Sequence, residues 1–505
     1  MILSRYNLKN IQSAQLQVPP DSVFDLPEKV LQFGTGVLLR GLPDYFIDKA
    51  NRKGIFNGRV IIVKSTDGGD ATAFEKQDGL YTLCVRGLEN GQPVSENIIN
   101  SSISRVLSAK TQWNTILQCA HLPHLKIIIS NTTEVGIQLV NDNINQHPPV
   151  SYPGKLLAFL YERYKAFNGS ADSGMVVVPT ELIVDNGKKL ESIVLELAHL
   201  NGLSESFIQW LESSNHFCSS LVDRIVPGKP DAHKKLEWEK ELGYKDDLMT
   251  VSEVYRLWAI EGNDHVRSVL SFAEADEGVV IAPKINLFRE LKLRMLNGTH
   301  TVSCGLAFLS GFETVKPAME SNWMSDCISE IMLNEIAPAI PYEVEKKDAE
   351  EFGAKVLDRF RNGAIEHHWI NITMQYTSKL KMRVVPVLQQ YYEVFESTPT
   401  YIAMGFAAWI LFMRSVKKEG NQYYGEYNGK QYPINDDSAD LLYRYWRRHP
   451  DASELTSVMS NSGLWGDDLD NLPGFTEAVK EKLQQMLDIG VDKTIQLTQT
   501  KKVVA

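Results

Sequence analysis

Short apolar runs alternate with longer stretches of helical spacing through the first half of the chain. The runs at residues 29–33, 59–63, 125–129 and 175–179 are rich in β-branched residues and have the length of single strands. Apolar strands that alternate with helices are typical of a parallel sheet with helices on both faces. We therefore expect an α/β fold, with a doubly wound, Rossmann-like sheet in the N-terminal part.

The pattern changes further along the chain. Residues 81–86 and 94–99 predict an antiparallel excursion around two glycines. From about residue 188 the spacing is mostly helical, and from about residue 285 it stays helical almost to the end. These patterns predict a dinucleotide-binding domain over residues 1–284 and a mostly α-helical substrate and catalytic domain over residues 285–505.

Charge and cysteine usage narrow the class of protein. The net charge of −11 argues against a basic surface for nucleic-acid phosphates. The 5 cysteines lack the spacing of metal ligands, and no window approaches the roughly 18 apolar residues of a membrane span. The N-terminus shows no basic segment followed by an apolar run, as a secretion signal would. We therefore expect a cytoplasmic protein with no metal, no nucleic acid and no membrane as partner.

A glycine turn follows the first predicted strand. Gly34, Thr35 and Gly36 separate that strand from a stretch of helical spacing that runs to about residue 49. Glycines at this place let the backbone approach a pyrophosphate at the start of a helix. The usual third glycine is replaced by Leu39, so a tight strand-to-helix turn without a ligand is the alternative. The position of the turn favours dinucleotide binding.

Residues after the second and third strands bear on the cofactor. Lys64 stands near the usual place of the acid that binds the adenosine ribose, and Asp67 comes later, so the residues alone leave NAD and NADP open. Residues 130–134 follow the third strand, whose C-terminal end faces the ligand crevice of such a sheet, although they could also cap the next helix. The predicted cofactor contacts are Phe33, Gly34, Thr35, Gly36, Arg40, Asn131, Thr132 and Glu134.

The segment with the clearest chemistry is residues 292–300. In an α-helix, at about 100° per residue, Lys292, Asn297 and His300 point at roughly 0°, 140° and 80°, within one half of the helix surface. A lysine can transfer a proton to or from oxygen, and an amide can stabilise the charge that develops on that oxygen. The three residues indicate carbonyl–alcohol interconversion. Exposed helix side chains, or an Asn297–His300 hydrogen bond between helices, are the alternative.

Several segments together resemble the polyol-specific long-chain dehydrogenases of the mannitol dehydrogenase family. They are the GxGxxxR segment at residues 34–40, and residues 77–83, 222–227, 290–300 and 378–386. The resemblance extends over residues 29–400 or so. It implies a Rossmann-like domain, NAD as the cofactor and a metal-independent hydride transfer.

The resemblance also implies a role for each matching residue. Lys292 would be the acid/base, Asn297 would hold the developing alkoxide, and His300 would complete the catalytic group. Lys379 and Asp223 would lie at the substrate.

One departure from the family pattern bears on the substrate. Mannitol dehydrogenases supply a second asparagine after the strand at 175–179, where this chain has Glu181. The departure favours the branch of the family that acts on sugar acids, and a carboxylate on the substrate needs a cation. Lys379, Lys381 and Arg383 are the candidates, and an arginine can bind a carboxylate with two hydrogen bonds. The closest likeness to that branch lies in residues 179–183, 207–211, 217–226 and 378–381.

The pair His367 and His368 is a further group with ligand chemistry. Adjacent histidines on a helix point about 100° apart, and no third ligand has suitable spacing, so a metal site is not predicted.

The predicted partner is a small-molecule sugar acid, bound by a monomer or a small homo-oligomer. An isomeric keto-acid such as fructuronate and an uncharged sugar such as fructose or mannitol are the nearest alternatives. A non-catalytic nucleotide or sugar sensor on the same fold is the alternative from another class, and the intact Lys292 and Asn297 argue against it.

Overall fold

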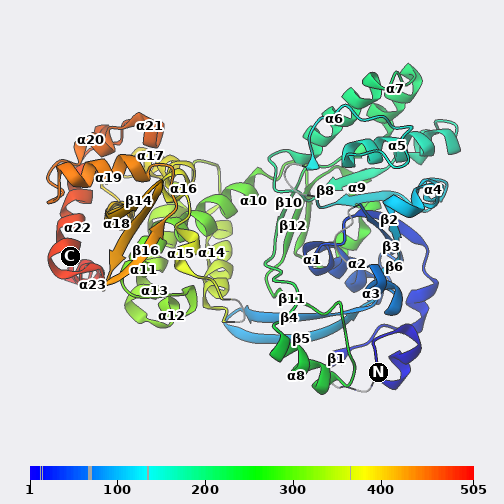
Figure 1. Ribbon diagram of the computed structural model, residues 1–505, viewed down its shortest axis with the longest axis horizontal. Helices are drawn as coiled ribbons and strands as arrows, with labels where there is room; N and C mark the ends of the chain where they lie inside the picture. Colours follow the sequence, from blue (N-terminus) through cyan, green and yellow to red (C-terminus); the bar gives the residue numbers. More distant parts are fainter. Residues whose placement is uncertain (12, 14, 66–70, 133–135, 364–365, 505) are drawn as a thin grey trace. The chain divides into compact units, whose positions relative to one another are not determined.

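The computed structural model describes residues 1–11, 13, 15–65, 71–132, 136–363 and 366–504. The chain divides into two units, the first made of Met1–Gly87 and Pro93–Ile285 and the second of Leu88–Gln92 and Asn286–Ala505. Each unit is described in turn (Figure 1).

Parallel strands form the main sheet of the first unit and confirm the predicted doubly wound fold. From β2 the chain adds strands first on one side and then on the other, so the strand order reverses between β2 and β7. In open α/β sheets ligands bind at the carboxyl ends of the strands beside such a reversal. In spatial order the strands are β6 (Ile103–Ser108), β3 (Arg59–Lys64), β2 (Glu28–Phe33), β7 (Ile127–Ser130), β8 (Val176–Pro179) and β9 (His216–Phe217).

Helices cover both faces of this sheet because successive strand residues point to opposite sides. Val30 and Ile62 belong to a core that α2 completes, whereas Leu31 and Ile61 belong to a second core that α4 to α7 complete. The α-helices of the first unit are α1 (Val37–Gly41), α2 (Pro43–Arg52), α3 (Ala71–Lys76), α4 (Ala109–Cys119), α5 (Tyr152–Ala166), α6 (Asn186–Leu200), α7 (Glu205–Ser214), α8 (Ala232–Leu242) and α9 (Asp264–Val269). Short 3-10 turns lie at η1 (Arg5–Asn10), η2 (Asp21–Asp25), η4 (Ala171–Ser173) and η5 (Ser271–Ala275).

Two smaller sheets correct the expectation that the chain is mostly helical after residue 188. One contains β10 (Ser220–Asp223), β12 (Leu257–Glu261) and β13 (Val279–Ala282). The other has the order β1 (Leu16–Gln17), β5 (Gln92–Asn100), β4 (Tyr81–Glu89) and β11 (Thr250–Glu253). The predicted strands at residues 81–86 and 94–99 lie within β4 and β5. The strands β10 to β13 are short, and β11 pairs with the distant β4, so local periodicity does not reveal them.

The second unit is mostly helical, as predicted. Its helices begin with α10 (Asn286–Glu290), the π-helix η6 (Leu291–Gly298) and α11 (Thr299–Leu309). The later helices are α12 (Val315–Glu320), α13 (Asn322–Ser329), η7 (Glu330–Ile336), η8 (Ala337–Ala339), α14 (Lys346–Arg361), α15 (Trp369–Ile372), α16 (Tyr376–Arg383), α17 (Val385–Val394), α18 (Thr400–Phe412), α19 (Ala439–Arg448), α20 (Thr456–Met459), α21 (Ser462–Trp465), η9 (Leu469–Asn471), α22 (Phe475–Ile489) and α23 (Val491–Val504).

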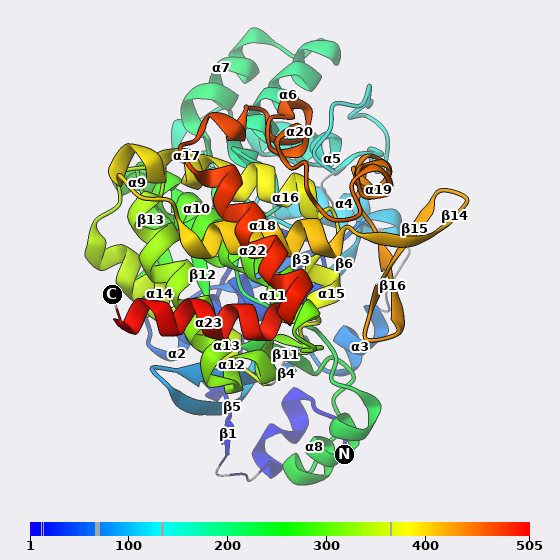
Figure 2. The same ribbon diagram turned by 90° about the vertical axis from the view of Figure 1, so that its left-hand side faces the viewer.

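The core of the second unit forms around α18. This helix is apolar on all sides and packs against α11 and α22 (Figure 2). A helix with no polar face is buried on all sides in a globular protein. None of the helices in the described part of the chain is long and apolar enough to cross a membrane.

An antiparallel sheet interrupts the helices of the second unit, where the sequence predicted helix almost to the end. It consists of β14 (Ser415–Glu419), β15 (Gln422–Tyr427) and β16 (Lys430–Ile434), and it extends to one side of the helices in Figure 2. Tight turns at Gly420 and Gly429, both in the left-handed region, join its strands. Gly420 and Gly429 are the residues from which these two hairpins could have been predicted in the sequence.

Candidate functional site

The glycine turn of the first unit begins where β2 ends. Gly34 has a φ of +128°, and its N–H donates to the carbonyl of Val63 on β3 over 3.1 Å. A Cβ atom at Gly34 would lie 2.9 Å from Leu39 Cδ1 and 3.1 Å from the carbonyl oxygen of Asn131. Glycine is therefore required here by conformation and by space.

Gly36 presents open backbone at the same turn. Its φ of −62° is ordinary, the residue is exposed, and no atom lies within 4 Å of a Cβ placed there. Thr35 beside it is half-buried. The helix that follows is shorter than predicted, because α1 ends at Gly41 and Leu42 separates it from α2. Open backbone beside the strand-order reversal fits the approach of a dinucleotide.

Phe33 and Arg40 have buried side chains. The Phe33 ring packs against Tyr152 with ring centroids 5.1 Å apart. The Arg40 guanidinium donates to the carbonyl of Leu248 over 2.6 Å and lies over the Tyr81 ring. Their described contacts are with protein, so both residues hold the turn in place, and direct contact of either with a cofactor stays a prediction.

A buried carboxylate that follows the next strand, β8, holds the residues directly after β7. Glu181 accepts hydrogen bonds from the backbone N–H and the hydroxyl of Thr132, over 2.8 and 3.0 Å, and from the Ser130 hydroxyl over 3.2 Å. Asn131 donates to the Thr180 hydroxyl over 3.0 Å. Burial raises the pKa of Glu181, and these hydrogen bonds oppose that rise. Asn131 and Thr132 therefore lie at the strand-order reversal as predicted residues of the cofactor site.

Two of the residues that we considered for the cofactor, Glu134 and Asp67, lie outside the described residues. Lys64 is the last residue of β3 and is half-buried. The choice between NAD and NADP rests on the surroundings of this strand end.

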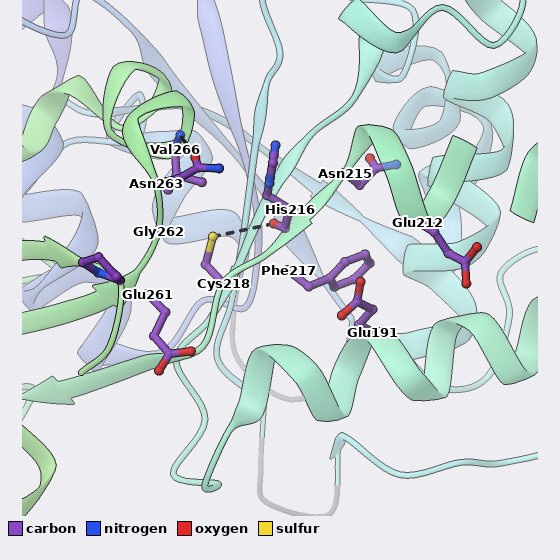
Figure 3. Close-up of a pocket in the computed structure, with 11 residues that line it drawn as sticks. Glu191, Glu212, Asn215, His216, Phe217, Cys218, Glu261, Gly262, Asn263 and Val266 are labelled. Carbon is purple, nitrogen blue, oxygen red and sulfur yellow. Dashed lines mark hydrogen bonds between the residues drawn. The ribbon is translucent and has the colours of Figure 1, made fainter. Parts of the chain in front are cut away.

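A separate cavity of the first unit has the wrong charge for the predicted ligands. It has a volume of about 500 Å³, and Glu191 of α6, Glu212 of α7 and Glu261 at the end of β12 line it (Figure 3). Lys188 lies 3.5 Å from Glu261. Burial and the neighbouring Glu212 raise the pKa of Glu191. Like charges repel, so this cavity suits neither a pyrophosphate nor a sugar acid.

The segment of residues 292–300 contains a π-helix, and this corrects the predicted α-helix. In a π-helix the N–H of residue i+5 bonds to the carbonyl of residue i, and such turns are frequent at functional sites. Lys292 and Asn297 are five residues apart in η6, so they follow one another on one side instead of about 140° apart. Both are half-buried, and the residues between them are mostly buried.

Two arginines hold the end of this π-helix. Arg383 of α16 donates to the backbone carbonyl of Asn297 over 3.4 Å and to the Thr301 hydroxyl over 3.1 Å. Arg294 pairs with Glu290 over 2.8 Å and donates to the backbone carbonyl of Met382 over 2.6 Å. Arg383, which we predicted to bind substrate, is thus within reach of the Asn297 backbone and also braces it.

His300 is buried at the start of α11. Its ring centroid lies 4.0 Å from that of Phe360 and 5.0 Å from that of His367. Burial, together with His367, Arg359, Arg383 and Lys379, holds the pKa of His300 well below its ordinary value. His300 is therefore neutral, and its Nε2 has no hydrogen-bond partner within the described residues.

Lys379 belongs to the same group of cations. Its ammonium donates to the carbonyl of Ile372 over 2.9 Å, and burial followed by the charge of Arg383 lowers its pKa. Within the second unit the structure thus brings Lys379 and Arg383 to His300. Asp223, the remaining predicted substrate residue, is buried at the end of β10 in the first unit.

Sequence reasoning missed the aromatic and histidine side chains around His300. Phe360 and Arg359 lie on α14 and carry no motif, while His367 and Trp369 belong to a segment that we considered only for metal. The paired histidines were the one signal that marked this segment. In the part of the chain that the structure describes, no three His, Cys, Asp or Glu side chains form a group that could hold a metal ion.

Comparison with known proteins places the chain in a family. Residues 28–272 match the Mannitol dehydrogenase Rossmann domain, and residues 284–487 match the Mannitol dehydrogenase C-terminal domain. The chain is 37% identical over 481 residues to an altronate oxidoreductase of Bacillus subtilis (strain 168), covering 94% of this chain and 96% of that protein. It is 35% identical over 480 residues to an altronate oxidoreductase of Shigella flexneri, covering 93% of this chain and 96% of that protein. These relatives confirm the sugar-acid branch that the sequence segments resembled.

Solved structures of low sequence identity share the fold. A mannitol 2-dehydrogenase of Pseudomonas fluorescens, solved with NAD and D-mannitol, superposes with a TM-score of 0.66 at 21% identity and covers 99% of this chain and 100% of its own. A D-sorbitol dehydrogenase in substrate-free form has a TM-score of 0.75 at 20% identity, covering 98% of this chain and 100% of its own. With both of its domains matched and relatives along nearly its whole length, the chain belongs to the mannitol dehydrogenase family and is an oxidoreductase.

Proposed function

We propose that this protein is an NAD-dependent altronate oxidoreductase, which reduces tagaturonate to altronate and catalyses the reverse reaction. The observation that carries the proposal is the group around His300. A lysine and an amide lie on one side of a π-helix, beside a buried histidine whose pKa is lowered and a cluster of cations, and this supports Lys292 as the acid/base. The relatives named altronate oxidoreductase support the substrate class.

The first unit supplies the dinucleotide site in this proposal. Gly34, Gly36, Asn131 and Thr132 surround the strand-order reversal, and the open backbone at Gly36 fits a pyrophosphate. When bound, NADH supplies the hydride that reaches the ketone carbon. Glu181 keeps Thr132 in place, so Thr132 does not have to reorganise when the cofactor binds.

The second unit supplies the proton and the stabilisation of charge. As the ketone is reduced, the Lys292 ammonium donates a proton to the ketone oxygen, and the Asn297 amide donates a hydrogen bond to that oxygen as it becomes an alkoxide. In the reverse direction Lys292 as amine accepts the hydroxyl proton. Neutral His300, whose Nε2 lacks a protein partner among the described residues, can bond a substrate hydroxyl.

The cluster of cations explains why the substrate is an acid. Lys379 uses one of its three N–H donors on Ile372, so the others remain for a substrate carboxylate. Arg383 adds positive charge beside it, and Asp223 is the predicted partner of a substrate hydroxyl. Asp436 is the acid that acts on Lys379, and a neutral sugar would bring no further negative charge to the cluster.

The test follows NADH absorbance with purified protein and tagaturonate, with fructuronate, fructose and NADPH assayed in parallel. We expect rapid loss of NADH with tagaturonate, slower loss with fructuronate and little with fructose. Activity with fructose in preference to both acids would contradict the sugar-acid proposal. NADH binding without turnover of any ketose would indicate a sensor.

We also propose a cytoplasmic location. The free cysteines Cys84, Cys119, Cys218, Cys304 and Cys327 are all buried, and thiols of this kind suit a reducing compartment. Measuring activity in cytoplasmic and periplasmic fractions of the source cell tests this point.

A further inference from the structure

A second histidine lies against the buried ring of His300, and the proposed reaction leaves it without a role. The His367 ring centroid is 5.0 Å from that of His300. Phe360 and Trp369 also contact the His300 ring, with centroids 4.0 and 5.9 Å from its own. His367 is therefore part of the wall around His300, although it comes from a different segment of the second unit.

Backbone hydrogen bonds fix the position of His367. Its carbonyl accepts from the N–H of Val315 over 2.9 Å, and the N–H of Trp369 donates to the carbonyl of Glu313 over 3.0 Å. Residues Thr314 and His368 form the antiparallel bridge between these bonds. The segment is held on both sides of His367, so its backbone presents the ring to His300.

The group contains polar atoms that the protein leaves unpaired. His300 Nε2 and Trp369 Nε1 are buried and have no hydrogen-bond partner in the described part of the chain. Buried polar atoms are normally paired, so two of them on rings in contact with each other indicate a polar ligand.

The charges that face His367 are positive. Burial, then Arg359 of α14, His368 of its own segment and Lys379 of α16, lower the pKa of His367. His300 of α11 is its ring neighbour. The acids of the segment, Glu313 and Glu366, lie beside His368 instead, and both are strongly exposed. An anion in this group would offset the repulsion among its cations.

The two arginines of the group are more fully engaged with the protein. Arg383 donates to Asn297 and Thr301, and Arg359 has an interaction partner of its own. Lys379 makes one hydrogen bond to Ile372 and retains further donors. His367 and Lys379 are therefore the pair best suited to an incoming carboxylate.

We propose that His367, together with Lys379, binds the carboxylate of the sugar acid and so makes the enzyme prefer an acid to the corresponding neutral sugar. This inference rests on the proposed function. It assigns His367 as a specificity-determining residue, whose contribution appears only when the substrate carries the carboxylate.

The test compares tagaturonate with tagatose, in which a hydroxymethyl group replaces the carboxylate. For His367→Gln we expect the KM for tagaturonate to rise about tenfold to a hundredfold, with little change in kcat and no comparable change for tagatose. His367→Arg, which supplies charged N–H donors at this position, should recover much of the loss. His368→Gln is the matched control, because His368 faces Glu313 and Glu366, and it should behave like the wild type.

Outcomes for the inference and for the proposed function are separate. If the wild type reduces no sugar acid, the proposed function is wrong, whatever the variants do. If the wild type reduces tagaturonate but His367→Gln lowers kcat/KM for tagaturonate and tagatose by the same factor, or changes neither, the inference on His367 is wrong. Should His367→Gln unfold, His367→Phe keeps a ring against His300 and removes the polar group, and the same result is expected.

Discussion

The glycine turn of the first unit and the π-helix of the second unit differ in what they offer a ligand. Around the turn, the Arg40 guanidinium and the Glu181 carboxylate bond protein atoms, although Arg40 Nε has no partner among the described residues, and the open backbone lies at Gly36. Around the π-helix, His300 is buried with an unpaired nitrogen, and its charged neighbours are cationic.

The difference matches two kinds of recognition. A dinucleotide is held mostly by backbone at a fixed turn, so side chains there serve to prevent movement. A substrate that changes its bonding needs side chains whose protons and charges are available to it. Side chains that bond protein atoms therefore hold the turn in place, whereas the substrate needs side chains with protons and charges available to it.

The largest effect is expected from Lys292→Ala, which removes the acting side chain. Turnover should fall about a hundredfold or more, because no other group on the π-helix can supply the proton at that position. The NADH dissociation constant, measured by fluorescence, should stay unchanged. Lys346→Ala is the control, since that lysine is almost fully exposed on α14. If Lys292→Ala turned over at the wild-type rate, Lys292 would not be the acid/base.

A second substitution alters a residue that builds the cofactor site. Gly34→Ala should weaken NADH binding about tenfold or more and lower the melting temperature, because of its φ of +128° and its contact with the Asn131 carbonyl. Gly36→Ala should weaken NADH binding alone, since nothing within 4 Å opposes the added methyl group. Equal melting temperatures for wild type and Gly34→Ala would contradict the first expectation.

Asp44 is one of several buried side chains of the first unit that have an unpaired polar atom within the described part of the chain, and burial of its carboxyl group has little compensation. Burial raises its pKa to about 7, and its Oδ1 has no partner among the described residues. The folded state then keeps a proton that the unfolded state loses at about pH 4, so the Asp44 contribution lowers stability as pH rises from about 4 to 7.

Asp44→Asn should remove that contribution, at most about 1.4 kcal/mol per pH unit. Urea unfolding of both proteins across this range isolates the effect, since other titrating groups are common to the two. Parallel stability curves would show that Asp44 is ionised in the folded protein.

The smallest effect is expected from Glu181→Gln, which weakens the bracing of Thr132. Stability should fall by about 1 kcal/mol, because the amide nitrogen of glutamine cannot accept the bonds that the carboxylate accepts. The KM for NADH should rise a few-fold while kcat changes little. Glu212→Gln in the acid-lined cavity is the control. A loss of kcat with unchanged KM would instead place Glu181 at the reacting atoms.

The fold of the first unit and the family could be predicted because their signals are local. Each of the strands β2, β3, β7 and β8 is a short apolar run that can be recognised from its own residues, and the glycine turn follows the first of them directly. Lys292, Asn297 and His300 lie within nine residues, so the resemblance to the family could be seen without any tertiary information.

Other features depended on contacts between distant segments. The strands β10 to β13 and the bracing of Thr132 by Glu181 arise from pairing across the chain, which residue period does not encode. The π-helix replaced the predicted α-helix where Arg383, far along the chain, bonds the carbonyl of Asn297.

The sequence by itself determined the strand–helix alternation, the glycine turn and the presence of an amine, an amide and an imidazole at positions 292, 297 and 300. Each of these features depends only on residues that are neighbours in the chain. The tertiary structure alone decided which polar groups are left unpaired. It buried Arg40 against Leu248, and it brought His367 and Lys379 to His300 from two other segments. Whether a charge is satisfied depends on what packs around it, and packing joins residues that the sequence keeps apart.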